Sequence, residues 1–242
     1  MAKSTGLAEQ FFQGVYDVSG DVSSIGSWST PVAVLDVTGI NSSAVERVQG
    51  LVGGNVSYNV WFNDAAGAAH LASRVPTTAS VFTWALGATV GDKAGMMSGL
   101  STSYDPSRSA DGALSFDIES LNDGVAPAWG VMLTPGSKTD TGAANGATLD
   151  QSAQTTAGAE AILHVTSFTG SNFTATVQDS SNGSSWGTLV AFTQVTAVGS
   201  ERVTVSGTVE RYVRVISTGT FNPVSFTVSF RRGESTDRVT YS

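Results

Sequence analysis

The sequence contains one match to a catalytic motif, GSSWG at residues 183–187, which has the G-x-S-x-G pattern of a nucleophile elbow. An elbow requires a strand followed by a helix, and a histidine later in the chain that activates the serine. Here no helix is predicted after the motif, and both histidines, His70 and His164, precede it. We therefore predict a hairpin loop at this position and no nucleophile.

A pair of carboxylates offers a second possible chemistry. Asp117 and Glu119 alternate along a predicted strand and so share a face, an arrangement that glycoside hydrolysis could use. No other candidate catalytic residue accompanies the pair. Two isolated histidines without any cysteine make a poor zinc site, and Asp179 is the only carboxylate of its loop, too few for calcium. We predict no catalytic site, no metal and no cofactor.

The second half of the chain alternates between apolar and polar residues in short runs, which is typical of β-strands. Turn-forming residues separate six such runs, AILHVTSF, SNFTATVQD, GTLVAFTQV, ERVTVSG, ERYVRVIS and PVSFTVSF. Six short strands within one region predict an antiparallel β-sandwich of the immunoglobulin-like or jelly-roll type.

The first half is predicted to be β-rich with one short helix. NVSYNVWFN alternates throughout, and PVAVLDV, SVFTWAL, GALSFDIESL and WGVML are further strand candidates. Asn63 and Asp64 can cap a helix over Ala65 to Arg74, which Val75 and Pro76 would end. The fold class is therefore mainly β.

Charge divides the chain into two unequal parts. Residues 1–150 hold fourteen acidic and six basic residues, whereas residues 151–242 hold six of each, which together give the net charge of −8. An acidic first half argues against tight binding of DNA or of an anionic membrane, because phosphate binding needs clustered lysine and arginine. It does not exclude a surface that DNA slides past.

The segment Trp129 to Asp150 lies where this acidic excess stops. We expect its first residues to form the last strand of one domain, and Thr134 to Asn145 to carry the chain outward. The predicted organisation is a first domain over 1–145, a β-sandwich over 146–233 and a C-terminal arm over 234–242. The sequence has no apolar run typical of a signal peptide or a membrane span, so we expect a soluble protein made in the cytoplasm.

Several blocks of the chain resemble the major tail, or tail tube, protein of long-tailed bacteriophages, in particular the versions from phages of actinobacteria. The blocks in the first half are VERVQGL, NVSYNVWFNDAAGAAHLASRVPTT, LGATVGDKAG, ADGALSFDIES and WGVMLTPGSKTDTGAANG. In the second half FTATVQDSSNGSSW and ERYVRVISTGTF resemble the appended β-sandwich of those proteins. The resemblance covers nearly the whole chain, and none of its blocks is catalytic.

This resemblance implies a tube domain of two orthogonally packed sheets with one helix. Six copies would form a ring with a continuous inner β-barrel, and stacked rings would form a virion tail tube that conducts DNA into the host without binding it. Asp117 and Glu119 would face the lumen, and Ile40 to Asn55 would form a loop between rings. The outer sandwich would decorate the tail beside other tail proteins, with weak contact to host-surface glycans through many copies.

Two alternatives remain open from sequence. In a carbohydrate-binding module with two domains, Trp186 and Tyr212 would form a platform for a sugar, although such residues more often belong to a core or a sandwich edge. In the other alternative, the chain would be a capsid protein or a capsid decoration protein.

Overall fold

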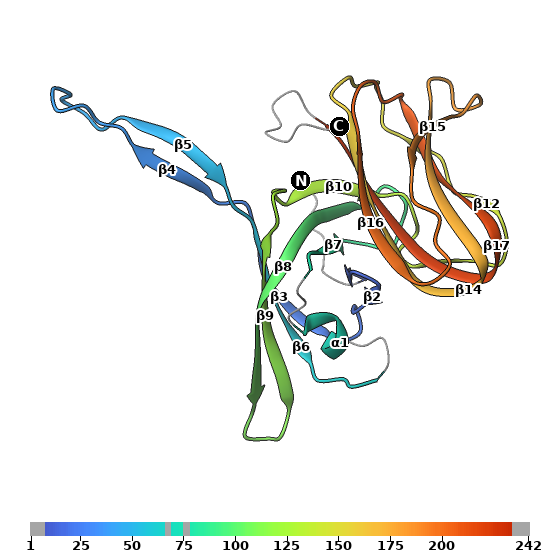
Figure 1. Ribbon diagram of the computed structural model, residues 1–242, viewed down its shortest axis with the longest axis horizontal. Coiled ribbons are helices and arrows are strands. Elements are labelled where there is room, and N and C mark those ends of the chain that lie inside the picture. Colours follow the sequence, from blue (N-terminus) through green and yellow to red (C-terminus); the bar gives the residue numbers. More distant parts are fainter. Residues whose placement is uncertain (1–7, 66–68, 75–77, 234–242) are drawn as a thin grey trace.

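The computed structural model describes residues 8–65, 69–74 and 78–233. It confirms a mainly β fold, with one short helix among these residues (Figure 1). In chain order the elements are β1 (Gln10–Gln13), β2 (Tyr16–Asp17), β3 (Val22–Ser29), β4 (Val32–Asp36), β5 (Arg47–Val52), β6 (Asn55–Trp61), α1 (Ala69–Ser73), β7 (Ser80–Ala85), β8 (Lys93–Arg108), β9 (Leu114–Asn122), β10 (Ala128–Met132), β11 (Lys138–Asp140), β12 (Ala144–Asn145), β13 (Leu149–Asp150), β14 (Ala159–Ser180), β15 (Gly187–Ala191), β16 (Gly199–Val205) and β17 (Tyr212–Arg232).

The first unit is a sandwich whose two layers share strand β8. Residues 99–108 of β8 pair with β9, which continues through β6 to β3. Residues 94–99 pair with β7, which continues to β1 and β2, while β10 pairs along the other side of β8. Buried side chains from both layers fill the space between them, including Phe11, Tyr58, Phe82, Met97 and Ile118.

The predicted alternation of β6 is confirmed, because Val56, Tyr58 and Val60 are buried and the intervening residues are not. The predicted helix over 65–74 is found as α1, five residues long, beside the sandwich. Its predicted end at Val75 and Pro76 lies outside the described residues. Asn63 Oδ1 accepts a hydrogen bond from the backbone N–H of Ala65, which forms a local turn before α1.

A tryptophan joins the two layers of the first unit. Trp84 of β7, Gly95 of β8 and Trp129 of β10 lie side by side in register, and Trp28 from β3 packs over the glycine. The Trp28 ring centroid lies 5.9 Å from that of Trp84 and 6.3 Å from that of Trp129. A Cβ atom at position 95 would come within 2.7 Å of the Trp28 ring, so only glycine leaves room for this contact.

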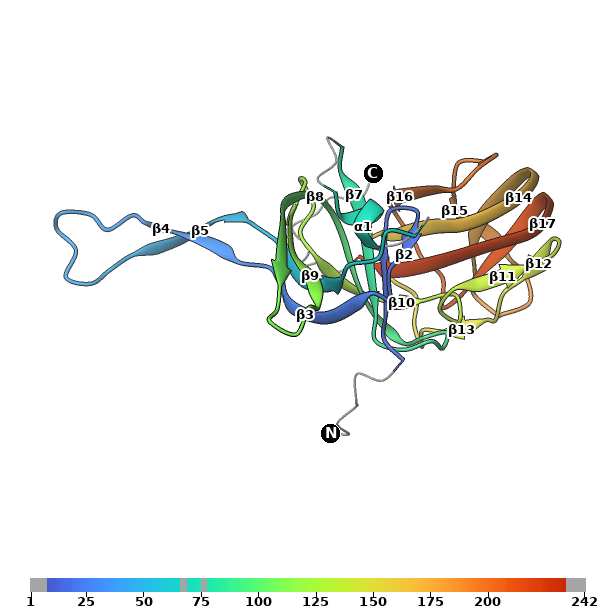
Figure 2. The ribbon, with the colours of Figure 1, turned by 90° about the horizontal axis from the view of Figure 1, so that it is seen from below.

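Strands β4 and β5 form a separate two-stranded sheet that projects away from the body of the molecule (Figure 2). We call this hairpin, residues 32–52, the arm. The sequence predicted a strand over PVAVLDV, and the resemblance implied a loop between rings over Ile40 to Asn55. Part of that segment is strand β5, which pairs with β4, and the chain from Asn55 onward is strand β6.

The second unit is a sandwich built mainly from two long, bent strands. Strand β14 and strand β17 pair along most of their length, with register shifts between Val165 and Asn172. Gly170 and Gly219 have φ angles of 151° and 127° at this bend, and a Cβ atom at either would meet backbone within 2.5 Å. The prediction of six short strands is therefore wrong in number, because a bend without a break joins two of the predicted pairs.

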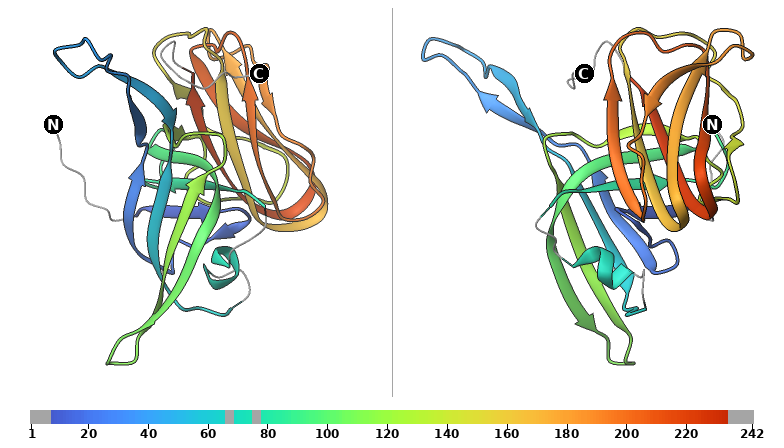
Figure 3. Two further views of the ribbon diagram at one scale, coloured as in Figure 1. Left: turned by 60° about the vertical axis from the view of Figure 1, so that its left-hand side comes forward. Right: turned by 45° about the vertical axis from the view of Figure 1, so that its right-hand side comes forward.

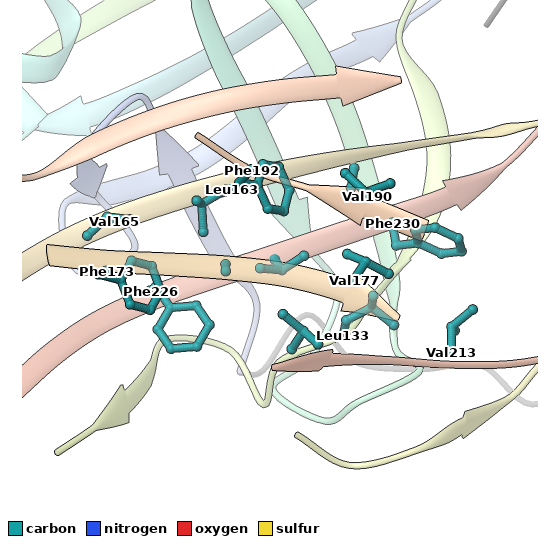
Figure 4. Close-up of a cluster of buried hydrophobic side chains, with 14 of the residues drawn as sticks. Leu133, Leu163, Val165, Phe173, Val177, Val190, Phe192, Val213, Phe226 and Phe230 are labelled. Atoms are coloured by element: carbon teal, nitrogen blue, oxygen red, sulfur yellow. The ribbon is translucent and has the colours of Figure 1, made fainter. Parts of the chain in front are cut away.

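Each half of the long strands belongs to a different layer of this second sandwich. The first half of β14 pairs with β16, and its second half pairs with β15. The core between the layers contains the residues labelled in Figure 4, among them Phe173, Phe192, Phe226 and Phe230. All four are at most 3% exposed.

The segment after β10 does not carry the chain outward as a free connection. Its strands β11, β12 and β13 all pair with β17, so residues 138–150 extend the second sandwich. Ser217 donates a 2.7 Å hydrogen bond to the buried carboxylate of Asp140, which also pairs with Lys138. The residues of this stretch are mostly small or polar and show no apolar alternation, so the sequence did not predict that they pair with β17.

Figure 3 shows the two units side by side. A strand ladder and a buried polar network join them. Strand β10 pairs with β17 through Val131 and Met132. Nδ1–H of His164 on β14 donates to the Gly14 carbonyl at 2.7 Å, so Nε2 accepts from the Thr83 hydroxyl at 2.8 Å. Thr83 Oγ1 in turn lies 2.9 Å from Ser229 Oγ. Burial lowers the pKa of His164 to about 4, which keeps the ring neutral at neutral pH.

Candidate assembly surfaces

The layer β3-β6-β9-β8 presents one face to the core and the other to solvent. We call the solvent side the polar face. Phe116, Ile118 and Ser120 of β9 are buried, whereas Asp117 and Glu119 between them point the other way. The neighbouring strands contribute mostly small polar side chains to this face, namely Ser24, Ser27, Ser29, Asn55, Ser57, Asn59, Ser103, Asp105, Ser107 and Ser115.

Hydrogen bonds cross the polar face perpendicular to its strands. Ser23 Oγ donates to Asn59 Oδ1 at 2.6 Å, and Asn59 Nδ2 donates to Asp117 Oδ1 at 2.8 Å. A parallel row runs from Ser29 through Asn55 to Glu119. Both rows end on a carboxylate. Several of the donors are therefore used within the sheet, and the acceptor oxygens of Asp117 and Glu119 terminate the rows.

The charge of the polar face is negative. Asp105 on β8 lies directly opposite Asp117 on β9, and Glu119 is two residues further along the strand. None of the outward positions of these four strands, within the described chain, is a lysine or an arginine. Like charges placed directly opposite one another destabilise a strand pair, so this arrangement is not explained by the stability of the monomer.

Both edges of this layer are open in the described structure. Strand β3 pairs with β6 on one side only. At the other end of the layer, residues 100–108 of β8 pair with β9 alone, because β7 and β10 pair with residues 93–99. An open edge leaves backbone N–H and C=O groups available to a strand from another chain.

The arm exposes large apolar side chains on both of its strands and at its tip. Seven such residues are at least 49% exposed, and Ile40 and Leu51 reach 108% and 87%. The others are Val34, Leu35, Val37, Val45 and Val48. A two-stranded hairpin alone in water is marginally stable at best, and exposed apolar clusters of this kind mark interaction sites.

The candidate residues for other chemistries are not brought together. Ser185 lies in a turn organised by Asn182, whose Oδ1 accepts from the backbone N–H of Ser184 and Ser185. His164 is fully buried and engaged between the two units. Among the described residues no group of three or more histidine, aspartate or glutamate side chains could hold a metal ion. The hairpin loop predicted from GSSWG agrees with this geometry.

The proposed sugar platform is partly covered. The guanidinium of Arg214 lies 4.2 Å from the Trp186 ring centroid, and that of Arg211 lies 4.9 Å from the Tyr212 centroid. Arg214 is held in place by two hydrogen bonds to Gln178 Oε1. A sugar stacking on this face of Trp186 would have to displace the arginine.

Asp105, the serine and asparagine rows and the open edge of β8 were not predicted from the sequence. The sequence of β8 has no regular apolar and polar alternation, because the strand bends between two layers. The sequence of β3 is rich in serine. Val22, Ile25 and Trp28 are three residues apart because the register of β3 shifts twice, so no period-two alternation marks this strand in the sequence.

Comparison with known proteins gives only distant likenesses. No protein-family model and no curated protein matches the chain. One solved chain, from the tail of an empty GTA particle with C6 symmetry, is 16% identical and covers 53% of this chain and 98% of its own, with a TM-score of 0.36. The SPP1 Dit protein, described as a hub adsorption apparatus protein of phages that infect Gram-positive bacteria, is 9% identical and covers 93% of this chain and 99% of its own, with a TM-score of 0.33.

These identities and TM-scores are too low to establish a shared fold or function. In the described part of the chain, no helix has the length and apolar character needed to cross a membrane. The features of this chain that bear on its function are therefore the polar face, the open edges and the arm.

Proposed function

We propose that this protein is a structural subunit of a bacteriophage tail, and that its copies form rings that stack into the tail tube. The open edge of β3 in one copy would pair with the open edge of β8 in the next, and closure of the ring would leave neither edge of this layer exposed. The sequence resemblance to tail tube proteins suggests six copies. The protein would act in the virion and would have no catalytic role.

The observation that carries this proposal is the polar face. A closed ring would turn this face toward a channel, where Asp105, Asp117 and Glu119 would repel the phosphates of passing DNA. Donors of Ser23, Ser29, Asn55 and Asn59 are bonded within the sheet, which lowers the number available to bind phosphate. The like-charge pair Asp105 and Asp117 would then lower the stability of the subunit but would help DNA to pass rapidly through the channel.

The arm and the second unit would have separate roles. The arm would contact the adjacent ring and so bury its apolar residues. The second sandwich would lie on the outside of the tube, next to other tail proteins and within reach of host-surface glycans. The sequence places the boundary between the two units at 145/146. We propose that it lies near Gly136, because β11 and β12 pair with β17, and that residues 234–242 form a C-terminal arm. The C-terminal arm lies outside the described residues.

Electron microscopy of the purified protein at low salt tests the proposal. We expect rings or tubes with a central channel. Persistent monomers that bind glycans would instead support a carbohydrate-binding module, and closed shells or binding to preformed capsids would support a capsid role.

A charge-reversal experiment tests the polar face itself. In assembled protein, replacing both Asp117 and Glu119 with lysine should create binding of double-stranded DNA that is measurable at low salt and weakens as salt rises. Glu201→Lys, placed on the second unit, changes the charge in the same direction and is the control. Equal DNA binding by the control and by the double variant would contradict a channel lined by the polar face.

A further inference from the structure

The large exposed apolar side chains of the first unit gather in more than one place. Seven lie on the arm, and three others, Trp61, Phe62 and Leu114, are 50%, 41% and 36% exposed. We call these three the end patch. The backbone N–H of Phe62 donates to the Leu114 carbonyl at 3.0 Å, and Trp61 pairs with Ser115. The three residues therefore lie at one end of the layer, with Trp61 on the side of the polar face and Phe62 packed against Phe116 on the other side.

The end patch rests on a rigid aromatic base. The Phe62 ring lies 5.5 Å from Phe116 and 5.3 Å from His70, and the Phe116 ring stacks on Tyr104 at 4.4 Å. His70 Nδ1 also contacts the Tyr104 hydroxyl. Aromatic side chains that are held in place but partly exposed are typical of the residues that dominate binding energy at protein interfaces.

The arm and the end patch lie at opposite ends of strand β6. The strand begins at Asn55, directly after the arm, and ends at Trp61 in the end patch. Figure 1 shows the same arrangement, with the arm at one end of the β3-β6-β9 layer and the turn between β8 and β9 at the other. A single chain therefore cannot bring its own arm onto its own end patch.

Two different patches at opposite ends of one subunit suit a heterologous contact. If each arm meets the end patch of the next copy, the contact repeats in one direction and builds an open polymer. An arm-to-arm contact would be isologous and would stop at a pair. The end patch would also remain exposed in such a pair, although it is a cluster of the kind that marks interaction sites.

We propose that the end patch is the docking site for the arm of a second copy of this chain, stacked head to tail. This inference rests on the proposed tail tube and names the surface that receives the arm. Ile40 and Leu51, the most exposed arm residues, would supply most of the aliphatic surface. Trp61 and Phe62 would supply the aromatic surface against which they pack.

Disulfide mapping tests the contact directly, because the natural chain has no cysteine. Ile40→Cys and Leu114→Cys are introduced together, and the assembled protein is oxidised. We expect a ladder of covalent oligomers on denaturing gels. Ile40→Cys with Val198→Cys is the matched control, since Val198 is 48% exposed on the second unit and should give no ladder.

A mixing experiment tests the direction of stacking. Ile40→Asp removes the arm contact and Trp61→Asp removes the end patch, so either variant alone should raise the protein concentration needed for tubes about tenfold or more. Mixed together, they should form stacks of two rings and no longer, because one variant keeps only a working arm and the other only a working patch. Both variants should keep the wild-type thermal unfolding temperature.

The outcomes separate this inference from the proposed function. Tubes that form with Trp61→Asp as readily as with the wild type, or that give a ladder only with the Val198 control, would overturn the end patch as the docking site and leave the tail tube intact. Wild-type protein that stays monomeric under all conditions would overturn both.

Discussion

The two units of the molecule differ most in what they leave exposed. Among the described residues, thirteen of the fourteen large apolar side chains with substantial exposure lie between Val34 and Trp129, and only Val198 belongs to the second unit. The second unit also has the larger core, with eighteen buried apolar residues in one cluster against ten in the first. The second unit therefore buries most of its large apolar side chains within one chain, whereas the first leaves large apolar side chains exposed.

The larger buried core and most of the exposed apolar side chains therefore lie in separate regions of one chain. The first unit tolerates an apolar arm, two open edges and a like-charge pair. Each of these features destabilises an isolated domain or makes it prone to association. The second unit has only Val198 as a large exposed apolar side chain among the described residues, and it is tied to the first by the β10 and β17 ladder and the His164 network.

The largest expected effect comes from a cavity in the second unit. Phe226 is fully buried, so Phe226→Ala should lower the free energy of unfolding of that unit by about 3–5 kcal/mol. Unfolding in denaturant can be followed by tryptophan fluorescence. Trp186 reports on the second unit, and the other four tryptophans report on the first. If the first unit of the Phe226→Ala variant unfolds at a lower denaturant concentration than the second, the loss of stability is not confined to the second unit, and the contrast between the two cores is wrong.

Acid should weaken the joint between the units. The folded pKa of His164 is about 4 against an ordinary 6.5, so the unfolded chain binds a proton that the folded chain does not. Stability should therefore fall as pH drops from 6.5 to 4, by up to about 3 kcal/mol. Asp150, with its pKa lowered to about 2 from 3.8, contributes only at lower pH.

The unfolding free energy measured at several pH values, for the natural chain and for His164→Gln, checks this dependence. The variant should be less stable at neutral pH and should lose the slope between pH 6.5 and 4. An unchanged slope in the variant would assign the pH dependence to other groups.

An added methyl group should separate the two layers of the first unit. Gly95→Ala places a Cβ atom 2.7 Å from the Trp28 ring, and overpacking of this kind costs about 1–3 kcal/mol. Gly142→Ala is the control, since nothing lies within 4 Å of its Cβ position. Thermal unfolding of both variants, followed by tryptophan fluorescence, measures the difference, and equal unfolding temperatures would contradict the packing described for Trp28.

The smallest effect on stability is expected for substitutions of exposed apolar residues, and on the arm such a substitution should have a large effect on assembly. Leu51 and Val198 are both exposed, so Leu51→Ser and Val198→Ser should each change the free energy of unfolding by no more than about 0.5 kcal/mol. Only Leu51→Ser should raise the concentration at which tubes form, as measured by light scattering. Impaired assembly in the Val198 variant would show that the second unit also takes part in stacking.

Local patterns in the sequence determined much of the fold. Alternation identified β6, β7, β9 and the strands of the second unit, because period two reports a sheet with one buried face. The same alternation placed Asp117 and Glu119 on one face of their strand, opposite Phe116 and Ile118. The absence of cysteine and the isolation of the two histidines argued against metal and thiol chemistry without any structure.

Only the tertiary structure decided how these strands combine. The bends at Gly170 and Gly219 turn two pairs of strands into β14 and β17, and the bend in β8 lets one strand serve two layers. Register placed Asp105 opposite Asp117 and Trp28 over Gly95, across separations that no local pattern reports. Alternation gives the face of each residue within its own strand, whereas partners, edges and the projecting arm depend on pairing between distant segments.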